Sequence, residues 1–449
     1  MIRYLTVVFL CLLIMGGYVI HQRFSNDLSL PPVATIDMQV KTLEIKGVPI
    51  WYVPNEGTDL VCFSISFKGA GSAQDRIPGL TKLFTAMLNE GTSEMHSEAF
   101  QNFLLDNQIQ LLPSFTSDHF SITIRTIASQ IGSAFEVVKQ IPKDLRFDQE
   151  DFGRNKDSIL VSLEQAKHDP FAFSSDNLKR LAYKKHPYFL TIEDQINGMS
   201  ELTTEHLKEV LLRFGQDNVQ ITAAGNITAS QLEDLVNILI DTLPKMAEVK
   251  SIPEAEFNTE KTLHYVNMPV PQSIIRFVMP AIDKKDPDYY AYELLTSILG
   301  GTAMKSRMYL DIREKRGLAY YAQTNIVDNE KLNALMGITG TSTENEKQVI
   351  QLIKDNIQIL QKEGVTTEEL AFEKQHSSGT FALSFDSLLG TVLTLSSIQL
   401  DDFPTSYIND YSKHLESVTL DQIKKVASKY LDVDKLIIVV TGQNHAVSV

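Results

Sequence analysis

A run of apolar residues at helical spacing marks one stretch in the first half of the chain. Pro78-Gly79 opens it, and the spacing predicts a helix over Leu80–Asn89. Its apolar face comprises Leu80, Leu83, Phe84, Met87 and Leu88. The face is continuous over more than two turns, so we expect it to pack into a core.

A second stretch combines a helix, a stop and a strand. Met304, Met308 and Ile312 are spaced for one buried face, which predicts a helix from about Thr302 to Lys315. Gly317 stands where a left-handed, helix-ending residue belongs. The apolar residues that follow, from 318 to 322, predict the start of a strand. The turn at the glycine therefore folds the chain back on itself.

Strand patterns recur in the two halves of the sequence in the same order. Alternation over 61–68 predicts a half-buried strand, and 115–125 suits a hairpin. The apolar runs 219–225 and 436–442 both end in glycine, and 263–266 and 272–279 repeat the opening strands of the first half. These parallels predict a duplicated α+β unit with antiparallel-rich sheets and helices packed on one face.

Length agrees with two units, because 449 residues exceed one ordinary core. Residues 246–262 are charged, contain Pro253 and lack periodicity, which predicts a linker. We expect the first domain over 36–245 and the second over 263–449.

The N-terminus has the pattern of an export signal. Arg3 precedes an apolar run, residues 5–20, that is short for a full membrane span, and residues 21–32 form a polar tether. Both an uncleaved signal anchor and a cleaved signal peptide fit this pattern. Either predicts a periplasmic or otherwise exported protein, and the first predicts attachment to the inner membrane.

Composition excludes some classes of function. The chain is 43% hydrophobic and 22% charged, as in globular proteins, and its formal net charge of −15 argues against nucleic acid as a partner. The two cysteines, Cys11 and Cys62, predict no disulfide framework, and Cys62 suits a core position. The ten histidines show no metal-ligand spacing. Five of them fit surface or capping positions better: His96, His119, His168, His186 and His206.

Arg313 and Tyr320 are the candidate functional residues of the second stretch. A guanidinium and a phenol at one spot can grip a peptide carbonyl, or an oxyanion developing from one. The alternative is purely structural: Arg313 caps carbonyls at a helix end, and Tyr320 is a half-buried strand residue.

The sequence of residues 299–321 closely resembles a known family motif. LGG, SR and IREKRGLAY are similar in order to the second-domain motif of the insulinase-like (pitrilysin, M16) metallopeptidases. In that family an Arg and a Tyr seven positions apart bind substrate and help to stabilise the tetrahedral intermediate. The resemblance implies these roles for Arg313 and Tyr320, and it extends more weakly from about residue 36 to the C-terminus.

The first stretch resembles the family's zinc helix without its ligands. In that family the H-x-x-E-H motif lies within a sequence such as GLAHFLEHMLFKGT, whereas this chain has GLTKLFTAMLNEGT at the corresponding positions. The ligand and general-base positions fall on Lys82, Thr85 and Ala86. The third ligand position aligns with Ser162, and Glu164 lies two residues further on. These residues cannot assemble a zinc site, and the Lys82 ammonium repels a cation.

The resemblance implies two homologous insulinase-like domains of α+β class. Some bacterial members divide the work between two chains, one with zinc and one with the Arg/Tyr pair. We therefore expect a non-catalytic, substrate-binding subunit that binds no cofactor itself and completes the site of a zinc-binding sibling acting on peptides. One alternative is a non-enzymatic peptide-holding or scaffold protein of the same fold. Another is an active protease with relocated ligands.

Overall fold

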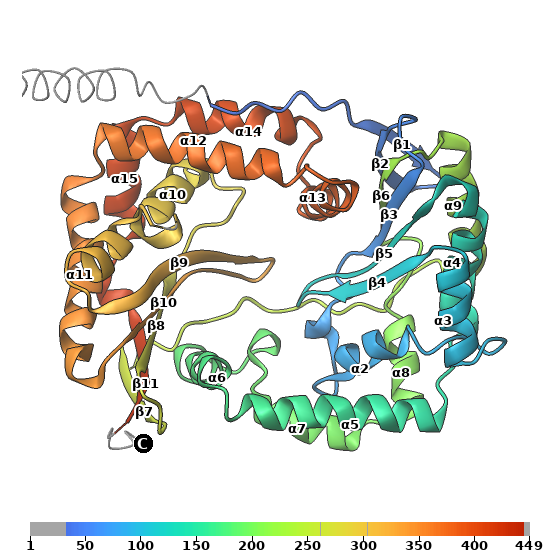
Figure 1. Ribbon diagram of the computed structural model, residues 1–449, viewed down its shortest axis with the longest axis horizontal. Helices are drawn as coiled ribbons and strands as arrows, with labels where there is room; N and C mark the ends of the chain where they lie inside the picture. Colours follow the sequence, from blue (N-terminus) through green and yellow to red (C-terminus); the bar gives the residue numbers. More distant parts are fainter. Residues whose placement is uncertain (1–32, 261, 303, 444–449) are drawn as a thin grey trace, which may run out of the picture.

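The computed structural model describes residues 33–443, apart from residues 261 and 303. The predicted signal segment, 5–20, lies outside these residues. Two β-sheets, each with its own helices, stand side by side (Figure 1). The fold is the predicted α+β class with two insulinase-like domains, whereas the domain boundaries stay predictions.

The first sheet has six strands in the order β1-β2-β6-β3-β5-β4. Neighbouring strands are antiparallel except the parallel pair β2 and β6. The strands are β1 (Lys41–Ile45), β2 (Val48–Pro54), β3 (Leu60–Phe67), β4 (Gln110–Phe115), β5 (Phe120–Ile127) and β6 (Val219–Gly225). The hairpin predicted over 115–125 therefore begins earlier, at Gln110.

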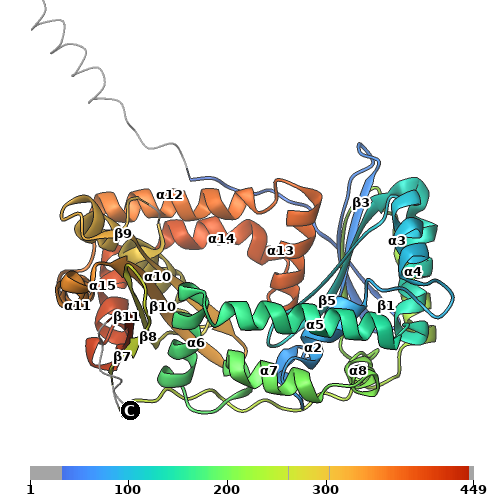
Figure 2. The same ribbon diagram turned by 60° about the horizontal axis from the view of Figure 1, so that its bottom comes forward.

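Helices cover one face of this sheet and continue along its lower edge (Figures 1 and 2). They are α2 (Leu80–Met87), α3 (Ser97–Asp106), α4 (Ile131–Asp144), α5 (Gln149–Ala166), α7 (Ile192–Glu201), α8 (Thr204–Leu211) and α9 (Ala229–Thr242). The predicted apolar face of α2 is fully buried in the core of this half.

The second sheet repeats the strand order of the first without its outermost strand. Its order is β7-β11-β8-β10-β9, again with one parallel pair, β7 and β11. The strands are β7 (Leu263–Asn267), β8 (Ser273–Pro280), β9 (Ala319–Asn329), β10 (Leu332–Thr341) and β11 (Ile437–Gly442). Its helices are α10 (Tyr289–Thr296), α11 (Glu346–Glu363), α12 (Thr367–Leu383), α13 (Leu388–Leu400), α14 (Ser406–Ser417) and α15 (Leu420–Tyr430).

Each half lends one helix to the other half. Helix α6 (Pro170–Ala182) leaves the first half and packs on β8 and β11 of the second sheet, while α13 packs on β3 and β6 of the first (Figure 1). Thr222 on β6 donates a 3.2 Å hydrogen bond to the Val392 carbonyl. The hydroxyl oxygens of Ser66 and Ser396 lie 2.9 Å apart. Each sheet thus has its own helices on one face and a borrowed helix on the other.

Cys62 lies beneath the borrowed helix α13. It is buried against Ala224 and Val392, and burial raises the pKa of its thiol to about 12. The core position predicted for Cys62 is therefore correct.

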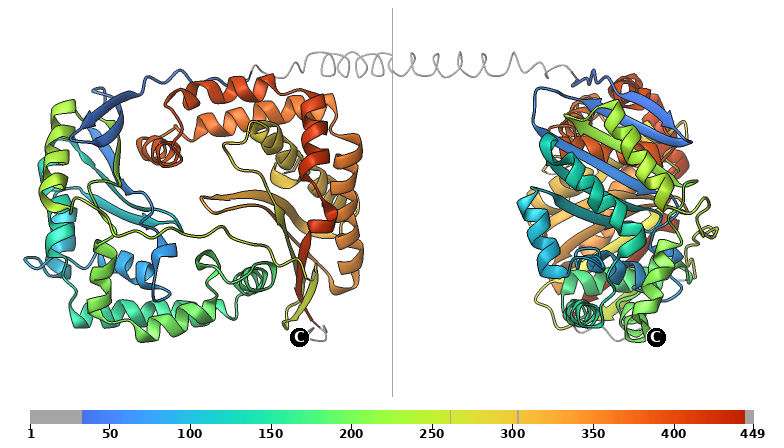
Figure 3. Two further views of the ribbon diagram at one scale, coloured as in Figure 1. Left: turned by 180° about the vertical axis from the view of Figure 1, so that it is seen from behind. Right: turned by 90° about the vertical axis from the view of Figure 1, so that its right-hand side faces the viewer.

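Residues 246–260 run from the first half toward the second along the outside of the molecule (Figure 3). The segment is extended. The Gln74 side chain donates to the Lys250 carbonyl at 2.8 Å and accepts from the Lys250 amide at 2.9 Å. The Ala255 amide donates to the Lys331 carbonyl at 2.9 Å. The segment therefore contacts both halves.

In the described part of the chain, no single helix has the length and apolar character to cross a membrane. Helices α12 and α13 pass such a test only as a consecutive pair, and the pair is bent by 110°.

Candidate functional site

Arg313 lies in a helical segment that differs from the predicted one. The helix does not run from Thr302, because Met304 has a left-handed φ of 63° and its side chain is 66% exposed. Residues Tyr309–Glu314 instead form a π-helix, with hydrogen bonds to the fifth residue back. Met308 and Ile312 are buried as predicted. The prediction was wrong about the start of the helix and right about its end.

Gly317 ends this helix as predicted. Its φ is +64°, its amide donates to the Arg313 carbonyl at 2.9 Å, and the Leu318 amide donates to the Ile312 carbonyl at 3.0 Å. These bonds satisfy carbonyls that the helix end leaves free. The chain then enters β9 at Ala319, so Tyr320 returns past the last helical turn.

The turn brings the two predicted site residues together. The guanidinium carbon of Arg313 lies 4.9 Å from the ring centre of Tyr320 and 4.8 Å from that of Tyr309. Contacts of this kind hold a guanidinium against an aromatic face while leaving its N–H donors free. No ion pair or hydrogen bond joins the guanidinium to another described residue. Tyr320 is 74% exposed, so its hydroxyl is open to a ligand.

The position of Tyr320 in the sheet explains its exposure. β9 is an edge strand, and its pairing with β10 is irregular between Thr339 and Thr341, opposite Tyr320. Such a bulge changes the direction of the side chains next to it. Gly340 sits at the bulge because a Cβ there would lie 2.8 Å from the Tyr321 hydroxyl. The structural alternative, a half-buried strand tyrosine, does not describe this side chain.

The degenerate zinc helix forms a separate site in the first half. Lys82, Thr85 and Ala86 of α2 line one cavity of about 610 Å³, together with β4, Ile159 of α5, and Leu389 and Leu393 of α13. The Thr85 hydroxyl donates to the Thr81 carbonyl at 2.7 Å and so is used within the helix. Arg313 and Tyr320 are not among the residues that line this cavity.

The donor set at this helix does not fit a zinc ion. An ammonium, a hydroxyl bonded to its own helix and a methyl group provide no ligand set for the metal. Ser162 on α5 is exposed and does not line the cavity. Over residues 33–443, without 261 and 303, no group of three or more His, Cys, Asp or Glu side chains could hold a metal ion.

The predicted surface or capping positions hold for four of the five histidines and fail for one. His96 and His168 are exposed. His206 accepts from the Thr203 amide at 3.1 Å, and His186 accepts from the Tyr188 amide at 3.2 Å, so both cap short helices. His119 is neither capping nor on the surface. It lies between the halves, its Nε2 is 3.8 Å from a Glu330 carboxylate oxygen, and burial lowers the pKa of its imidazole.

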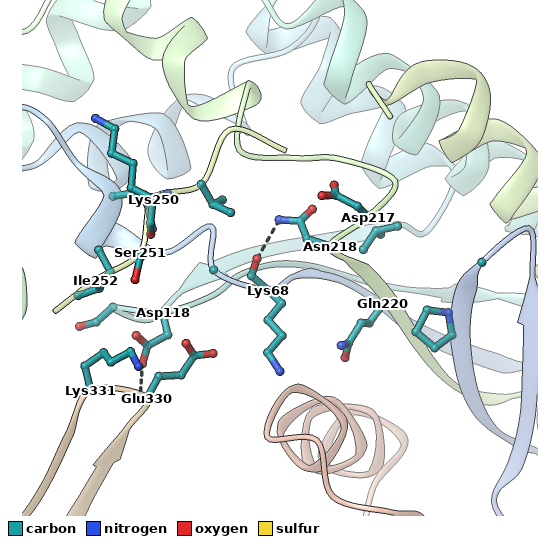
Figure 4. Close-up of a pocket in the computed structure, with 17 residues that line it drawn as sticks. Lys68, Asp118, Asp217, Asn218, Gln220, Lys250, Ser251, Ile252, Glu330 and Lys331 are labelled. Atoms are coloured by element: carbon teal, nitrogen blue, oxygen red, sulfur yellow. Dashed lines mark hydrogen bonds between the residues drawn. The ribbon is translucent and has the colours of Figure 1, made fainter. Parts of the chain in front are cut away.

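A charged cluster that sequence reasoning missed joins the two halves beside His119. A cavity of about 550 Å³ there is lined by both halves and by residues 249–252 (Figure 4). The Glu330 amide donates to Asp118 at 3.1 Å, and Lys68 Nζ lies 2.5 Å from Asp402 Oδ1. Positive and negative groups alternate, so the cluster is suited to holding the halves together rather than to binding one charged ligand.

Comparison with known proteins agrees with the geometry. Residues 202–376 match the family model described as the Peptidase M16 inactive domain. The non-peptidase homologue YmxG of Helicobacter pylori is 21% identical over 394 residues, covering 87% of this chain and 90% of that protein. An uncharacterised zinc protease, YmxG of Bacillus subtilis, is 22% identical over 372 residues, covering 82% and 89%.

A solved structure agrees in fold. The crystal structure of a peptidase M16 inactive domain from Pseudomonas fluorescens superposes with a TM-score of 0.84 at 25% identity, covering 91% of this chain and 99% of that one. Fold and site together define a two-domain, insulinase-type protein whose metal-binding helix has lost its ligands. Residues 202–376 thus match the M16 peptidase family, and the chain as a whole has the fold of a peptidase M16 inactive domain.

Proposed function

We propose that this chain is the substrate-binding subunit of a two-chain zinc metallopeptidase that cleaves peptides outside the cytoplasm. The partner is a sibling chain of the same fold that carries H-x-x-E-H and its zinc. Arg313 and Tyr320 complete that chain's site by holding the substrate and the oxyanion that forms on the scissile carbonyl.

The observation that carries this proposal is that the hydrogen-bond donors of Arg313 and Tyr320 are not used within the described chain. Arg313 is fixed against two aromatic rings but keeps its donors unused, and the Tyr320 hydroxyl is exposed. An arginine that only stabilised a helix end would spend its donors on carbonyls or carboxylates of its own chain. This arrangement instead leaves two donors ready for a ligand, which favours the subunit over a pure scaffold.

The export signal predicted for residues 5–20 supports a location beyond the inner membrane, with the signal segment as the anchor. A reporter fused after Val449 distinguishes the two sides of the membrane. Activity of that reporter in the cytoplasm alone would refute the location.

The direct test is reconstitution. The purified chain, the H-x-x-E-H sibling from the same genome, and their mixture are each incubated with a peptide library. We expect cleavage by the mixture and none by this chain alone. Full cleavage by the sibling alone, unchanged when this chain is added, would exclude the two-chain site.

A further inference from the structure

Two lysines line a second, smaller cavity next to the degenerate helix. Lys82 on α2 and Lys179 on α6 both border this cavity of about 230 Å³, which is also lined by Asp75 and Gly79 before α2 and by several residues between 187 and 195. Neither ammonium group makes a hydrogen bond or an ion pair with any other residue that the structure describes.

The carboxylates near these lysines are already engaged. Asp75 lines the same cavity, but one of its oxygens lies 3.0 Å from Arg213 Nη1 and the other accepts from the Thr81 amide at 3.0 Å. Asp176, which precedes Lys179 on α6, accepts from the Ile192 amide at 2.6 Å. The two ammonium groups therefore lack a dedicated counter-ion.

The electrostatic effect is visible in both lysines. Burial lowers the pKa of Lys82, and the charge of Lys179 lowers it further. Burial also lowers the pKa of Lys179, with Asp176 acting against this shift and Arg276 of the second sheet adding to it. Positive charge gathered without a partner in a partly buried space is stabilised by a bound anion.

The size of the smaller cavity and the residues around it indicate which class of anion can bind there. About 230 Å³ is less than the roughly 300–1,000 Å³ of sites for drug-sized ligands, but it is enough for one carboxylate-bearing group. Lys82 and Phe115 also line the larger cavity, whose other walls include Leu111, Leu389 and Leu393. A ligand with a carboxylate at one end and apolar side chains next to it matches both spaces.

We propose that Lys82 and Lys179 form a carboxylate-binding site for peptides, in which a C-terminal carboxylate or an acidic side chain enters the smaller cavity and apolar neighbours occupy the larger one. The helix position that binds a metal cation in catalytic relatives thus binds an anion here. The site is distinct from Arg313 and Tyr320, and it requires no zinc-binding partner.

The test is calorimetric titration of the purified full-length chain with four probes. They are acetyl-Leu-Ala-Phe with a free carboxylate, the same peptide amidated, amidated acetyl-Leu-Ala-Phe-Glu, and inorganic phosphate. We expect either carboxylate peptide to bind at least about ten times more tightly than the amidated tripeptide, as a charge-assisted hydrogen bond allows. The two carboxylate peptides distinguish a chain end from a side chain.

Variants locate the site. Lys82→Met and Lys179→Met should each weaken binding of the carboxylate peptides about tenfold or more and leave the amidated peptide unaffected. Lys82→Arg and Lys179→Arg keep the charge and should retain most of the binding. Lys208→Met removes a lysine of α8 that is exposed and paired with Glu205, and it serves as the matched control.

Three outcomes would overturn the proposal. The first is equal affinity for the free and amidated tripeptides. The second is unchanged binding by folded Lys82→Met and Lys179→Met. The third is phosphate binding as tight as that of the carboxylate peptides, which would replace a peptide site by a general anion site. Because both methionine variants remove a poorly compensated charge, their melting temperatures should equal or exceed that of the wild type.

Discussion

Arg276 on β8 donates a 2.8 Å hydrogen bond from Nε to the Ser174 hydroxyl on α6, and its Nη2 donates to the Phe171 carbonyl at 3.1 Å. The two bonds fix a helix of the first half onto the sheet of the second. On the other side, α13 of the second half covers the sheet of the first. Smaller apolar clusters at α6 and α13 therefore connect the two halves, and we expect the halves to unfold as one unit.

Trp51, the only tryptophan in the sequence, reports on this coupling. It lies on β2 against a cluster that includes Leu395 and Ile398 of α13. The change in Trp51 fluorescence in urea should coincide with the loss of helical circular dichroism. Two separated transitions would contradict the coupling.

Leu395→Ala tests the same contact energetically. Its side chain is fully buried, so the substitution should lower the free energy of unfolding by about 2–5 kcal/mol and shift both signals together. Leu383→Ala is the control, because that side chain is 68% exposed and its loss should matter by no more than about 0.5 kcal/mol. A shift in only one of the two signals would show that the halves are independent.

Tyr320→Phe tests the role of the exposed hydroxyl. In the reconstituted pair we expect turnover to fall by a factor of about a hundred to a thousand, as is usual when one oxyanion donor is lost. Partner binding and melting temperature should stay unchanged because the exposed hydroxyl makes no hydrogen bond to a described residue. Arg313→Ala should weaken both substrate binding and turnover.

Tyr309→Phe is the matched control for the loss of a phenol at this site. It keeps the ring that lies against Arg313, so peptide cleavage should stay near the wild-type rate. Undiminished cleavage by folded Tyr320→Phe and Arg313→Ala complexes would assign the pair a structural role and favour the scaffold alternative.

Local patterns were sufficient to predict much of this site. The apolar face of α2, the glycine stop at Gly317 and the strand that follows depend on neighbouring residues, and the structure agrees with each. The start of the helix before Arg313 was mispredicted. Met304 has the helical spacing, but the chain turns through a left-handed residue there, and the tertiary fold outweighs the pattern.

Other parts of the site had no signal in the sequence. Lys179 and Lys82 line one cavity only because α6 crosses between the halves. The exchange of α6 and α13 was missed for the same reason. Periodicity tells which face of a helix is buried, but it does not tell which sheet buries it.

Gly317→Ala tests the turn that joins Arg313 to Tyr320. The left-handed φ should cost an alanine about 1–2 kcal/mol of unfolding free energy, although no atom lies within 4 Å of the added Cβ. Gly379→Ala, in the interior of α12 with equally open space, should instead stabilise the chain by about 0.5–1 kcal/mol. Equal effects of the two substitutions in urea unfolding would show that backbone conformation at Gly317 is unimportant.

The buried carboxyl group of Glu293 on α10 should make the free energy of unfolding depend on pH. Its Oε1 accepts from the Tyr411 hydroxyl at 2.5 Å, whereas its buried Oε2 has no hydrogen-bond partner in the described chain. Burial raises the pKa of Glu293 from 4.5 to about 7, although the Tyr411 hydrogen bond acts in the opposite direction. Between these two pH values the folded chain binds more protons than the unfolded chain, so the free energy of unfolding falls as pH rises.

Glu293→Gln removes this ionisation. From pH 4.5 to 7 the variant should lose less stability than the wild type, by at most about 3 kcal/mol over the whole window. Urea unfolding at several pH values measures the difference, with the exposed Glu94→Gln as control. An identical pH dependence of wild type and Glu293→Gln would contradict the raised pKa.

The borrowed helix α13 also sets an order for folding during synthesis. All six strands of the first sheet have been made once residue 225 has left the ribosome, but the helix that covers their second face begins only at Leu388. Until then Cys62 and Ala224 lie on an uncovered apolar surface. The nascent first half therefore has to be shielded from aggregation while the second half is translated, and its folding is completed only near the end of synthesis.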